Sequence, residues 1–379
     1  MWHNLEVKII NFSDLEIQAH YQTLLNQSAL SFCQQESDWI ELVKNQNEDT
    51  PFLVSCFDED RLIAGMLIYL FSHSKGNVLF TNPQLGSIGN LIVKDGYDLK
   101  SILEKMVPKI DTFSKENNCL SYTIASQPFF DQSIFDLTLN YDYSLYNELL
   151  CVDLNCYFND DNSVALKDYN KRSQLSRSLK KGINNGFYTE ETKEKKDLDA
   201  WYEQHIIRCK EHDANIIPQP FLYDLYNYLI KNDLGTLLVL KKSDKIIGGG
   251  IFVYSNHIVD IYRMSTSKVY QNQGANYVFI DFAIKWAREK GARYFNWQAS
   301  NPPSGGIFNF KMQWGSSRIP YKFYTKLLDS EKIQETITLD SAKEIYRNTF
   351  IVPYAFFENP SQKDFNKDSA PCFLPNAIK

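Results

Sequence analysis

A short polar segment at residues 270–276, with the sequence YQNQGAN, has backbone groups suited to holding an anion. It lies between an expected strand and an expected helix. Gly274 and Ala275 are small enough for the backbone to approach a ligand, and the first N–H groups of a helix have no intrahelical partner. Together they predict a cradle for a diphosphate. The alternative is an ordinary polar turn in which Asn272 or Gly274 caps the helix.

The expected strand before this segment presents two side chains suited to acid–base chemistry. Asp260 and Tyr262 alternate with Ile261 and therefore share one face of the strand. Asp260 can accept a proton from an attacking amine, and Tyr262 can donate a hydrogen bond or a proton. The structural alternative is an aspartate paired with a cation and a tyrosine in the core. Gln298 and Ser300 share a face of the next expected strand and are predicted to line the same cleft.

A lysine with aromatic neighbours follows in an apolar stretch bounded by glycines, GGIFNFKMQWG at residues 305–315. Lys311 stands between Phe310 and Trp314. An ammonium group there can neutralise charge that builds on a carbonyl oxygen or a phosphate during acyl transfer. The alternative is a surface lysine on a short helix, with its aliphatic stem along apolar surface.

Residues 169–185 predict a basic helix without an acidic residue. Three of its cations lie on one face, because two of them follow Arg177 by three and four positions. This face can bind the phosphates of coenzyme A, of a tRNA acceptor end or of a nucleotide-linked substrate. It can equally be a solvated charged surface. The cations of the helix are Lys171, Arg172, Arg177, Lys180 and Lys181.

The two halves of the chain resemble each other, which predicts a duplication. Each half has two apolar strands joined by a short charged turn, then an amphipathic helix, then a strand. A helix between strands implies a parallel pair in a mixed sheet, with a ligand expected where the strands diverge. The matching segments are residues 51–70, 98–115 and 119–126 in the first half and residues 235–254, 274–290 and 292–300 in the second. Further elements are expected at residues 145–154 (strand), 198–212 and 219–231 (helices).

Three motifs resemble the GNAT-type N-acyltransferases, and more narrowly the Fem-type aminoacyl transferases and FemAB-like GNAT proteins. Residues 270–276 resemble the acyl-CoA pyrophosphate loop, Q/R-x-x-G-x-G/A, although Asn276 stands at its last position. Residues 305–315 resemble the F-K-x-x-(F/W)-G signature. The basic helix resembles the R-x-x-R-K-A-x-x-x-G-(V/F) segment, with Lys180 and Gly182 as departures.

The resemblance implies an α/β fold of two tandem GNAT-like domains, each a mixed β-sheet flanked by helices. We expect an N-terminal domain at residues 1–155, a C-terminal domain with the donor site at 164–330, and a helix with an extended tail at 331–379. Residues 86–96 do not form a loop of the same kind before the first-half helix, so the N-terminal donor site is expected to be degenerate.

The expected reaction is direct attack by an amine on an activated acyl group. The co-substrate is acyl-CoA, with acetyl-CoA favoured, and no tightly bound cofactor is expected. The acceptor is a small amine such as an amino sugar of a surface polysaccharide or a cell-envelope precursor. An aminoacyl-tRNA donor remains an alternative, as does a non-catalytic binding protein on the same scaffold. The predicted residues are catalytic Lys311, Asp260 and Tyr262; donor-binding Gln271, Gln273, Gly274, Ala275 and Asn276; and substrate-binding Arg172, Arg177, Lys180, Gln298, Ser300 and Trp314.

Composition limits the other classes of function. A net charge of −6 argues against a general nucleic-acid binder. Seven scattered cysteines without a CxxC pair, and His205 and His212 without a third ligand at a suitable spacing, predict no metal site. Neither a signal peptide nor an apolar run of membrane-spanning length is present, so a cytoplasmic protein is expected.

Overall fold

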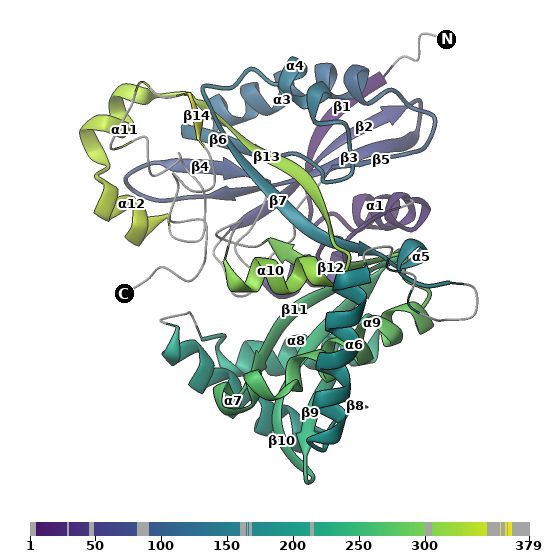
Figure 1. Cartoon of the computed structure of the whole chain (residues 1–379). Coiled ribbons are helices and arrows are strands. Elements are labelled where there is room, and N and C mark those ends of the chain that lie inside the picture. The colour runs from purple at the N-terminus through teal and green to yellow at the C-terminus, as the bar shows by residue number, and fades with distance from the viewer. Residues whose placement is uncertain are drawn as a thin grey trace. The chain divides into compact units, whose positions relative to one another are not determined.

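The protein is described by a computed structural model that covers residues 5–28, 30–44, 49–81, 91–159, 164, 166, 169–212, 216–299, 305–346, 357, 361 and 363–365. The chain divides into two compact units, each with parallel and antiparallel strand pairs and flanking helices, as predicted (Figure 1). Unit 1 comprises Met1–Glu148 and Ile319–Pro375, and unit 2 comprises Leu149–Arg318 and Asn376–Lys379. The domain boundaries expected from the sequence stay a prediction.

The sheet of unit 1 has the strand order β1-β2-β3-β4-β6-β13, with β5 pairing β3 and β14 pairing β7. The β4–β6 pair is parallel, and the other pairs along this path that are resolved in register are antiparallel. The elements of this unit are β1 (Leu5–Asn11), α1 (Leu15–Gln27), η1 (Cys33–Gln35), α2 (Ser37–Lys44), β2 (Thr50–Asp58), β3 (Arg61–Phe71), β4 (Asn77–Phe80), β5 (Leu91–Val93), α3 (Leu99–Glu116), β6 (Cys119–Ala125), α4 (Gln132–Thr138), α11 (Ser330–Thr336), α12 (Leu339–Ile345) and β14 (Asp364–Phe365), with most of β7 (Tyr143–Asp153) and β13 (Ser317–Leu327).

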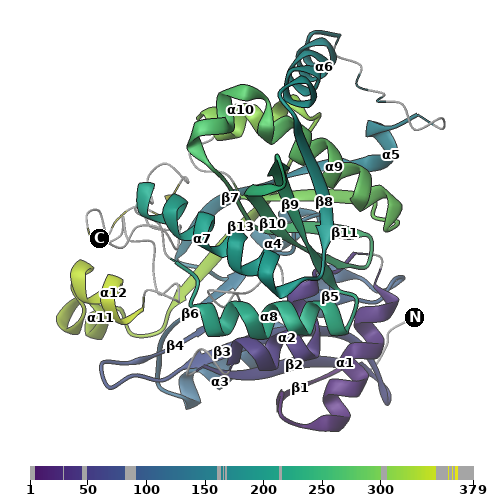
Figure 2. The ribbon, with the colours of Figure 1, turned by 90° about the horizontal axis from the view of Figure 1, so that it is seen from below.

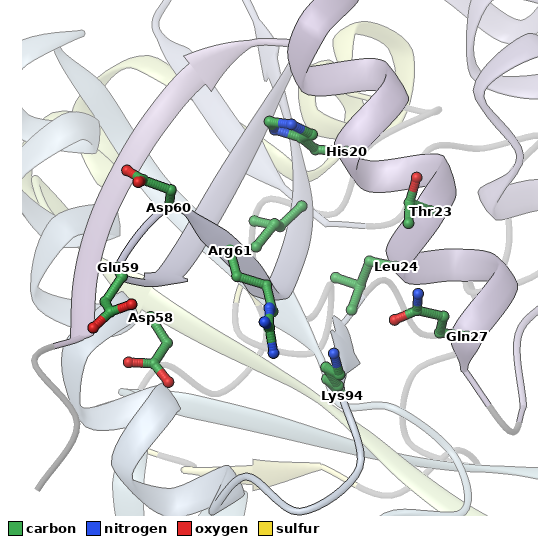
Figure 3. A pocket seen from close by; sticks show the side chains of 10 residues that line it. His20, Thr23, Leu24, Gln27, Asp58, Glu59, Asp60, Arg61 and Lys94 are labelled. Carbon is green, nitrogen blue, oxygen red and sulfur yellow. The ribbon is translucent and has the colours of Figure 1, made fainter.

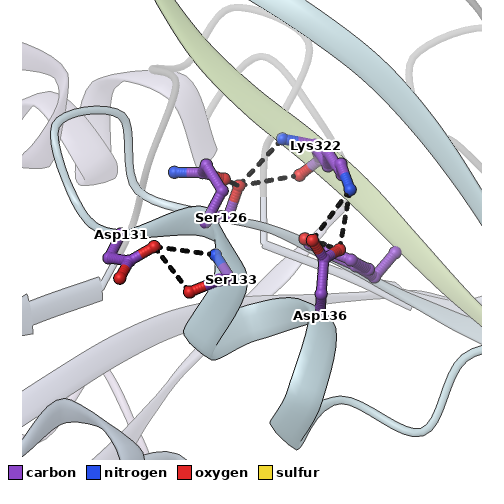
Figure 4. A network of polar contacts seen from close by, with 7 residues as sticks. Ser126, Asp131, Ser133, Asp136 and Lys322 are labelled. Atoms are coloured by element: carbon purple, nitrogen blue, oxygen red, sulfur yellow. Dashed lines mark hydrogen bonds and ion pairs between the residues drawn. The ribbon is translucent and has the colours of Figure 1, made fainter.

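A polar network fastens α4 to the sheet of unit 1 (Figure 4). Lys322 Nζ on β13 lies 2.7 and 3.0 Å from the two carboxylate oxygens of Asp136 on α4. The hydroxyl of Tyr324, two residues on, donates to the same carboxylate at 2.9 Å. The Ser126 hydroxyl accepts from the backbone N–H of Lys322 at 2.8 Å and so joins the end of β6 to β13.

The sheet of unit 2 has the strand order β8-β9-β10-β11-β12-β7, in which β11 and β12 are parallel. Helices α7 and α8 pack against β9, β10 and β11 and lie together on one side of these strands (Figure 2). The elements are α5 (Leu154–Tyr157), α6 (Tyr169–Asn184), β8 (Phe187–Thr192), α7 (Lys195–Glu211), α8 (Gln219–Lys231), β9 (Gly235–Lys242), β10 (Lys245–Ser255), β11 (Ile258–Thr266), η2 (Lys268–Gln273), α9 (Ala275–Glu289), β12 (Tyr294–Ala299) and α10 (Gly306–Gln313).

The strands and helices of the two units repeat the same order, which confirms the predicted tandem arrangement. The hairpins β2–β3 and β9–β10, the helices α3 and α9, and the strands β6 and β12 occupy the positions expected from the sequence repeat. A strand at residues 145–154 was predicted and corresponds to β7, but its pairing was not predicted, and neither was β13. The last five residues of β7 pair antiparallel with β12 in unit 2, and β13, which follows α10 in the chain, pairs antiparallel with β6 in unit 1.

Helix α9 is oriented by the apolar face that its sequence predicts. Its buried residues include Val278, Phe279, Ala283 and Trp286. The rings of Phe279 and Trp286 lie 5.8 and 6.1 Å from the ring of Phe252 on β10. Since only the short helix η2 separates α9 from β11, burying this face places the start of α9 near the carboxyl end of β11. Among the helices described, none is long and apolar enough to cross a membrane.

Candidate functional site

The parallel strands β11 and β12 separate at the centre of unit 2. Their register runs from Ile258 opposite Tyr294 to Asp260 opposite Asn296, although both strands continue further. Each strand has a register shift just beyond that point. The β10–β11 register skips Tyr262, and the β12–β7 register passes from Asn296 opposite Cys151 to Ala299 opposite Leu149. Such bulges bend a strand away from its neighbour and redirect its side chains.

A buried polar network lies where the strands part. Asn296 donates through Nδ2 to Asp260 Oδ1, and Gln298 Nε2 donates to the same oxygen at 3.4 Å. Asn296 Oδ1 accepts from the Gln298 backbone N–H at 2.9 Å and from the Cys151 thiol at 3.4 Å. Asp260, Asn296 and Cys151 are at most 2 % exposed. A carboxylate kept from water but hydrogen-bonded in this way is a proton acceptor held in one orientation.

Lys311 points at the same strand from α10. Its Nζ donates to the carbonyl oxygen of Trp297 at 3.0 Å, next to Asn296 in β12. Burial raises the pKa of the Cys151 thiol well above its usual value, Asp260 raises it further, and Lys311 opposes the shift. The carboxylate of Asp260 and the ammonium of Lys311 are thus bonded to two consecutive residues of β12, Asn296 and Trp297.

The aromatic neighbours of Lys311 pack against one another. The Phe310 ring lies 5.2 Å from Tyr277, 6.1 Å from Trp297 and 6.1 Å from Trp314. Lys311 itself is half-buried. An ammonium group beside this apolar wall acts in a medium of lower dielectric constant than water, which strengthens its field at a nearby oxygen.

Tyr262 lies at the bulge of β11. Burial raises the pKa of its hydroxyl, while Arg263 opposes the shift. The guanidinium carbon of Arg263 is 5.0 Å from the centre of the Tyr262 ring. The phenol is therefore protonated at neutral pH and can act as a hydrogen-bond or proton donor.

A cavity of about 410 Å³ opens at the start of α9. Gly274 caps the helix without a side-chain hydrogen bond, in the left-handed conformation with φ +91°. Within the described part of the chain, the N–H groups of Ala275 and Asn276 have no carbonyl or side-chain acceptor. The cavity is lined by Ser178, Lys181, Gln271, Asn272, Gly274, Asn276, Tyr277, Gly306, Asn309, Phe310 and Gln313. Among the described residues that line it, Lys181 is the one with a charged side chain, and its positive charge favours an anion.

Helix α6 holds the loop before α9 in place. Lys181 Nζ donates to the Asn272 carbonyl at 2.8 Å, and Asn185 Nδ2 donates to the Gln273 carbonyl at 2.9 Å. Because a trans peptide points its N–H opposite to the preceding C=O, the N–H groups of Gln273 and Gly274 point away from α6. A Cβ atom on Gly274 would lie 2.6 Å from the backbone nitrogen of Gly182, so the two segments meet without side chains between them.

Three of the five predicted donor-binding residues line the cavity with their own atoms, and the side chains of the other two lie elsewhere. Gln271, Gly274 and Asn276 line the cavity. The Gln273 side chain instead donates to the Val269 carbonyl at 3.0 Å, and the Ala275 methyl group is buried in the core. Gln273 and Ala275 therefore contribute backbone atoms to this region.

The predicted substrate-binding residues are also divided. Gln298 contacts Asp260, and Trp314 packs in the aromatic cluster around Lys311. Three exposed cations of α6, Arg172, Arg177 and Lys180, do not line the cavity. Ser300 lies outside the described residues. The functional roles assigned to these residues stay predictions.

Sequence reasoning missed several residues that complete the site. Asn296 has the same strand alternation as Gln298 and could have been found by extending that pattern two positions back. Cys151 could not, because only the pairing of β7 with β12 places it there. Lys181 bonds the loop before α9, whereas the sequence pattern favoured Arg177 and Lys180 on the same helix. The contact depends on how α6 packs on α9, which the sequence does not specify.

Unit 1 differs at the corresponding helix start. Asp98 caps α3, and its carboxylate accepts from the Ser101 backbone N–H at 2.8 Å. A carboxylate on the first turn occupies the helix start with negative charge, where unit 2 has Gly274. Residues 86–90 of the segment considered in the sequence lie outside the described residues.

A second hollow, of about 770 Å³, lies in unit 1 between α1 and the β2–β3 turn (Figure 3). It mixes three acidic side chains, Asp58, Glu59 and Asp60, with the basic side chains of Arg61 and Lys94. It is not at the end of the parallel β4–β6 pair, so it does not reproduce the arrangement of unit 2.

Comparisons with known proteins agree with this geometry. Residues 198–309 match the family model described as the Acetyltransferase (GNAT) family. The fold resembles that of FemX, with a TM-score of 0.64 at 11 % identity over 87 % of this chain and 99 % of that chain. No curated protein matches the sequence.

Two further solved structures share the fold. One is the C-terminal domain of a protein named as a lysylphosphatidylglycerol synthetase from Agrobacterium fabrum, with a TM-score of 0.54 at 14 % identity over 82 % of this chain and 92 % of that chain. The other is L-PGS from Bacillus licheniformis, with a TM-score of 0.50 at 14 % identity over 86 % of this chain and 96 % of that chain. At these identities the likeness concerns the fold.

Proposed function

We propose that this chain, which carries a GNAT acetyltransferase domain within a FemAB-like fold, is an N-acyltransferase that moves an acyl group from acyl-CoA to an amine. The resemblance predicted from the loop at residues 270–276 is confirmed at the level of family and fold. One observation carries the proposal. Asp260 and Lys311 converge on the point where β11 and β12 part, next to an uncapped helix start with a cavity.

The donor is proposed to bind with its diphosphate at the start of α9. The N–H groups of Ala275 and Asn276 and the positive end of the helix dipole favour an anion there. Lys181 lines the same cavity and adds a positive charge. Acetyl-CoA is the donor that we favour, because a cavity of about 410 Å³ with one cation suits a compact carrier.

The chemistry follows from the three predicted catalytic groups. The amine attacks the thioester carbonyl, Asp260 accepts the amine proton, and Lys311 stabilises the negative charge on the carbonyl oxygen. The bond from Lys311 Nζ to the Trp297 carbonyl oxygen holds the ammonium group beside β12. The C–N bond forms, the C–S bond breaks, and Tyr262 donates the proton that converts the thiolate to coenzyme A. Positioning and charge stabilisation supply most of the rate enhancement.

The acceptor is proposed to be an amino sugar or another amine of a cell-envelope precursor. Gln298 is placed to orient it, since its side chain contacts Asp260. If the acceptor carries phosphate, the exposed cations Arg172, Arg177 and Lys180 on α6 are suited to bind it.

An aminoacyl-tRNA donor is the second candidate, and α6 is the feature that favours it. The helix spans 16 residues, so it is about 24 Å long at 1.5 Å per residue. Its exposed cations Arg172, Arg177 and Lys180 are spread along the helix and are not among the residues that line the cavity. A strand of several phosphates can use such a row, whereas coenzyme A reaches only part of it.

The proposal is tested by incubating the full chain with acetyl-CoA or with charged tRNA, each against a panel of amino sugars and other amines. Free thiol or deacylated tRNA and acylated amine are measured. We expect transfer from acetyl-CoA, and we expect Lys311→Ala to lower kcat by about 100-fold or more. Lys285→Ala is the matched control, because Lys285 is an exposed lysine of α9 paired with Asp281. Turnover with charged tRNA alone favours the second candidate, and no turnover with either donor supports the non-catalytic alternative.

A further inference from the structure

We propose that Asn296 is a positioning residue that fixes Asp260 for proton transfer, an inference that rests on the proposed function. Asn296 is fully buried, and both ends of its side-chain amide are engaged. It is the residue of β12 directly opposite Asp260 in the parallel register. Asn296 and Asp260 form the last pair before β11 and β12 separate, so the Asn296 side chain can orient the residues that follow in both strands.

The hydrogen bonds of Asn296 determine which way its amide faces. Its Oδ1 accepts from two groups, the Gln298 backbone N–H at 2.9 Å and the Cys151 thiol at 3.4 Å. An amide oxygen that serves two donors leaves the NH₂ end to face Asp260. The NH₂ group can only donate, and such a bond is stronger to a carboxylate than to a protonated acid. The contact therefore favours the ionised, proton-accepting form of Asp260.

The same side chain shapes the bulge that reaches Lys311. A bond from the asparagine oxygen to the N–H two residues ahead is an Asx turn, which bends the backbone locally. Gln298 has φ +65°, in the left-handed region, and its side chain also donates to Asp260. Trp297, between them, presents its carbonyl oxygen to Lys311. Asn296 thus fixes the orientation of the Asp260 carboxylate and also the position of the Trp297 carbonyl oxygen that accepts from Lys311.

Several ionisable groups face this network from the surrounding elements. Cys151 lies on β7 and is coupled to both Asp260 and Lys311 of α10. Tyr262 and Arg263 follow Asp260 on its own strand, and Arg263 also acts on His205 of α7. These groups are unchanged in a variant that alters only residue 296, so a new pH dependence in that variant reports on the contact with Asp260.

The first test is N296D, which is nearly isosteric and keeps an oxygen for Gln298 and Cys151. Two carboxylates would then face each other in a site closed to water, and they would share a proton. Because the folded pair binds a proton that the unfolded chain releases, the stability lost by N296D grows as pH rises from 5.5 to 8. N232D is the matched control, since Asn232 is an exposed helix-end residue whose side chain donates to the Tyr228 carbonyl at 3.0 Å.

The second test exchanges the two groups in the double variant N296D/D260N. One amide and one carboxylate again face each other, so the pH-dependent loss of stability disappears and the melting temperature recovers most of its deficit. Acyl transfer does not recover, because the carboxylate now stands on β12; we expect kcat/KM to remain at least about 100-fold below wild type. In N296D alone, the acidic limb of the pH–rate profile moves up by about one pH unit or more.

Each result has a separate meaning. A melting-temperature deficit of N296D that is the same at pH 5.5 and 8, or that the double variant does not repair, overturns the positioning role. Repair of stability together with an unshifted pH–rate profile in N296D also overturns it, since Asn296 would then be structural only. If the wild-type chain transfers no acyl group from any donor while the stability pattern holds, the proposed function fails and the Asn296–Asp260 contact stands.

Discussion

Gly182 lies where α6 packs against the start of α9, and replacing it with alanine should have two opposing effects on the free energy of unfolding. Gly182 is interior to α6 and its φ is not in the left-handed region, so Ala at this position should stabilise the helix by about 1 kcal/mol if space were available. Space is absent. A Cβ on Gly182 would lie 2.5 Å from the Gly274 carbonyl oxygen and 2.6 Å from Val278 Cγ2.

The steric term outweighs the propensity term in Gly182→Ala. Overpacking of this kind costs about 1–3 kcal/mol. Moving α6 away also weakens the bonds of Lys181 and Asn185 to the loop, at roughly 0.5 kcal/mol for each partly exposed bond. After the gain in helix propensity of about 1 kcal/mol is subtracted, the net loss is about 1–3 kcal/mol.

Urea unfolding of Gly182→Ala against wild type measures this loss, and titration with acetyl-CoA measures its consequence for the donor site. We expect affinity to fall about tenfold, which corresponds to about 1.4 kcal/mol. Ser176→Ala is the control, because Ser176 is an exposed residue of the same helix and Ala there should be neutral or slightly stabilising. A Gly182→Ala variant that is more stable than wild type and binds acetyl-CoA equally well would refute the close packing of α6 on the donor loop.

Two further predictions concern stability. Asp136→Asn removes the ion pair with Lys322 and weakens the hydrogen bond from Tyr324. The free energy of unfolding should therefore fall by about 1 kcal/mol, a figure reduced because both charged groups are partly exposed. A variant as stable as wild type at both low and high salt would contradict this prediction. Burial, reinforced by Arg263, lowers the pKa of His205 to about 4. The folded state therefore favours the neutral ring, and stability present above pH 6.5 is lost as pH falls towards 4, by about 3 kcal/mol in total. Urea unfolding at pH 7 and pH 4.5 checks this, and His205→Phe should remove that part of the pH dependence; an unchanged pH dependence would contradict it.

The sequence was sufficient for elements defined by local pattern. Alternating and helical periodicity predicted the hairpins at residues 51–70 and 235–254 and the helix at residues 274–290, because one face of each element must be buried. Glycine near the start of α9 and the apolar surroundings of Lys311 predicted the region of the site. These signals lie within a few residues of the groups that they concern.

Features that depend on pairing between distant segments could not be predicted in the same way. The contact of Asn296 with Cys151 requires β7 to pair with β12, and the two residues are 145 positions apart in the chain. The sequence has no local sign of that pairing. The choice between Lys181 and its neighbours similarly depends on the Gly182–Gly274 contact, which decides the face that α6 presents to the loop.

The central claim is that the start of α9 binds the anionic part of an acyl carrier, and Asn276→Glu tests it most directly. Asn276 lines the cavity at the second helical residue, where a carboxylate opposes a bound phosphate while remaining compatible with the helix dipole. Calorimetric titration with acetyl-CoA should show binding to wild type and at least about a tenfold weaker affinity for the variant at an unchanged melting temperature. An equal dissociation constant for the two proteins would contradict the account.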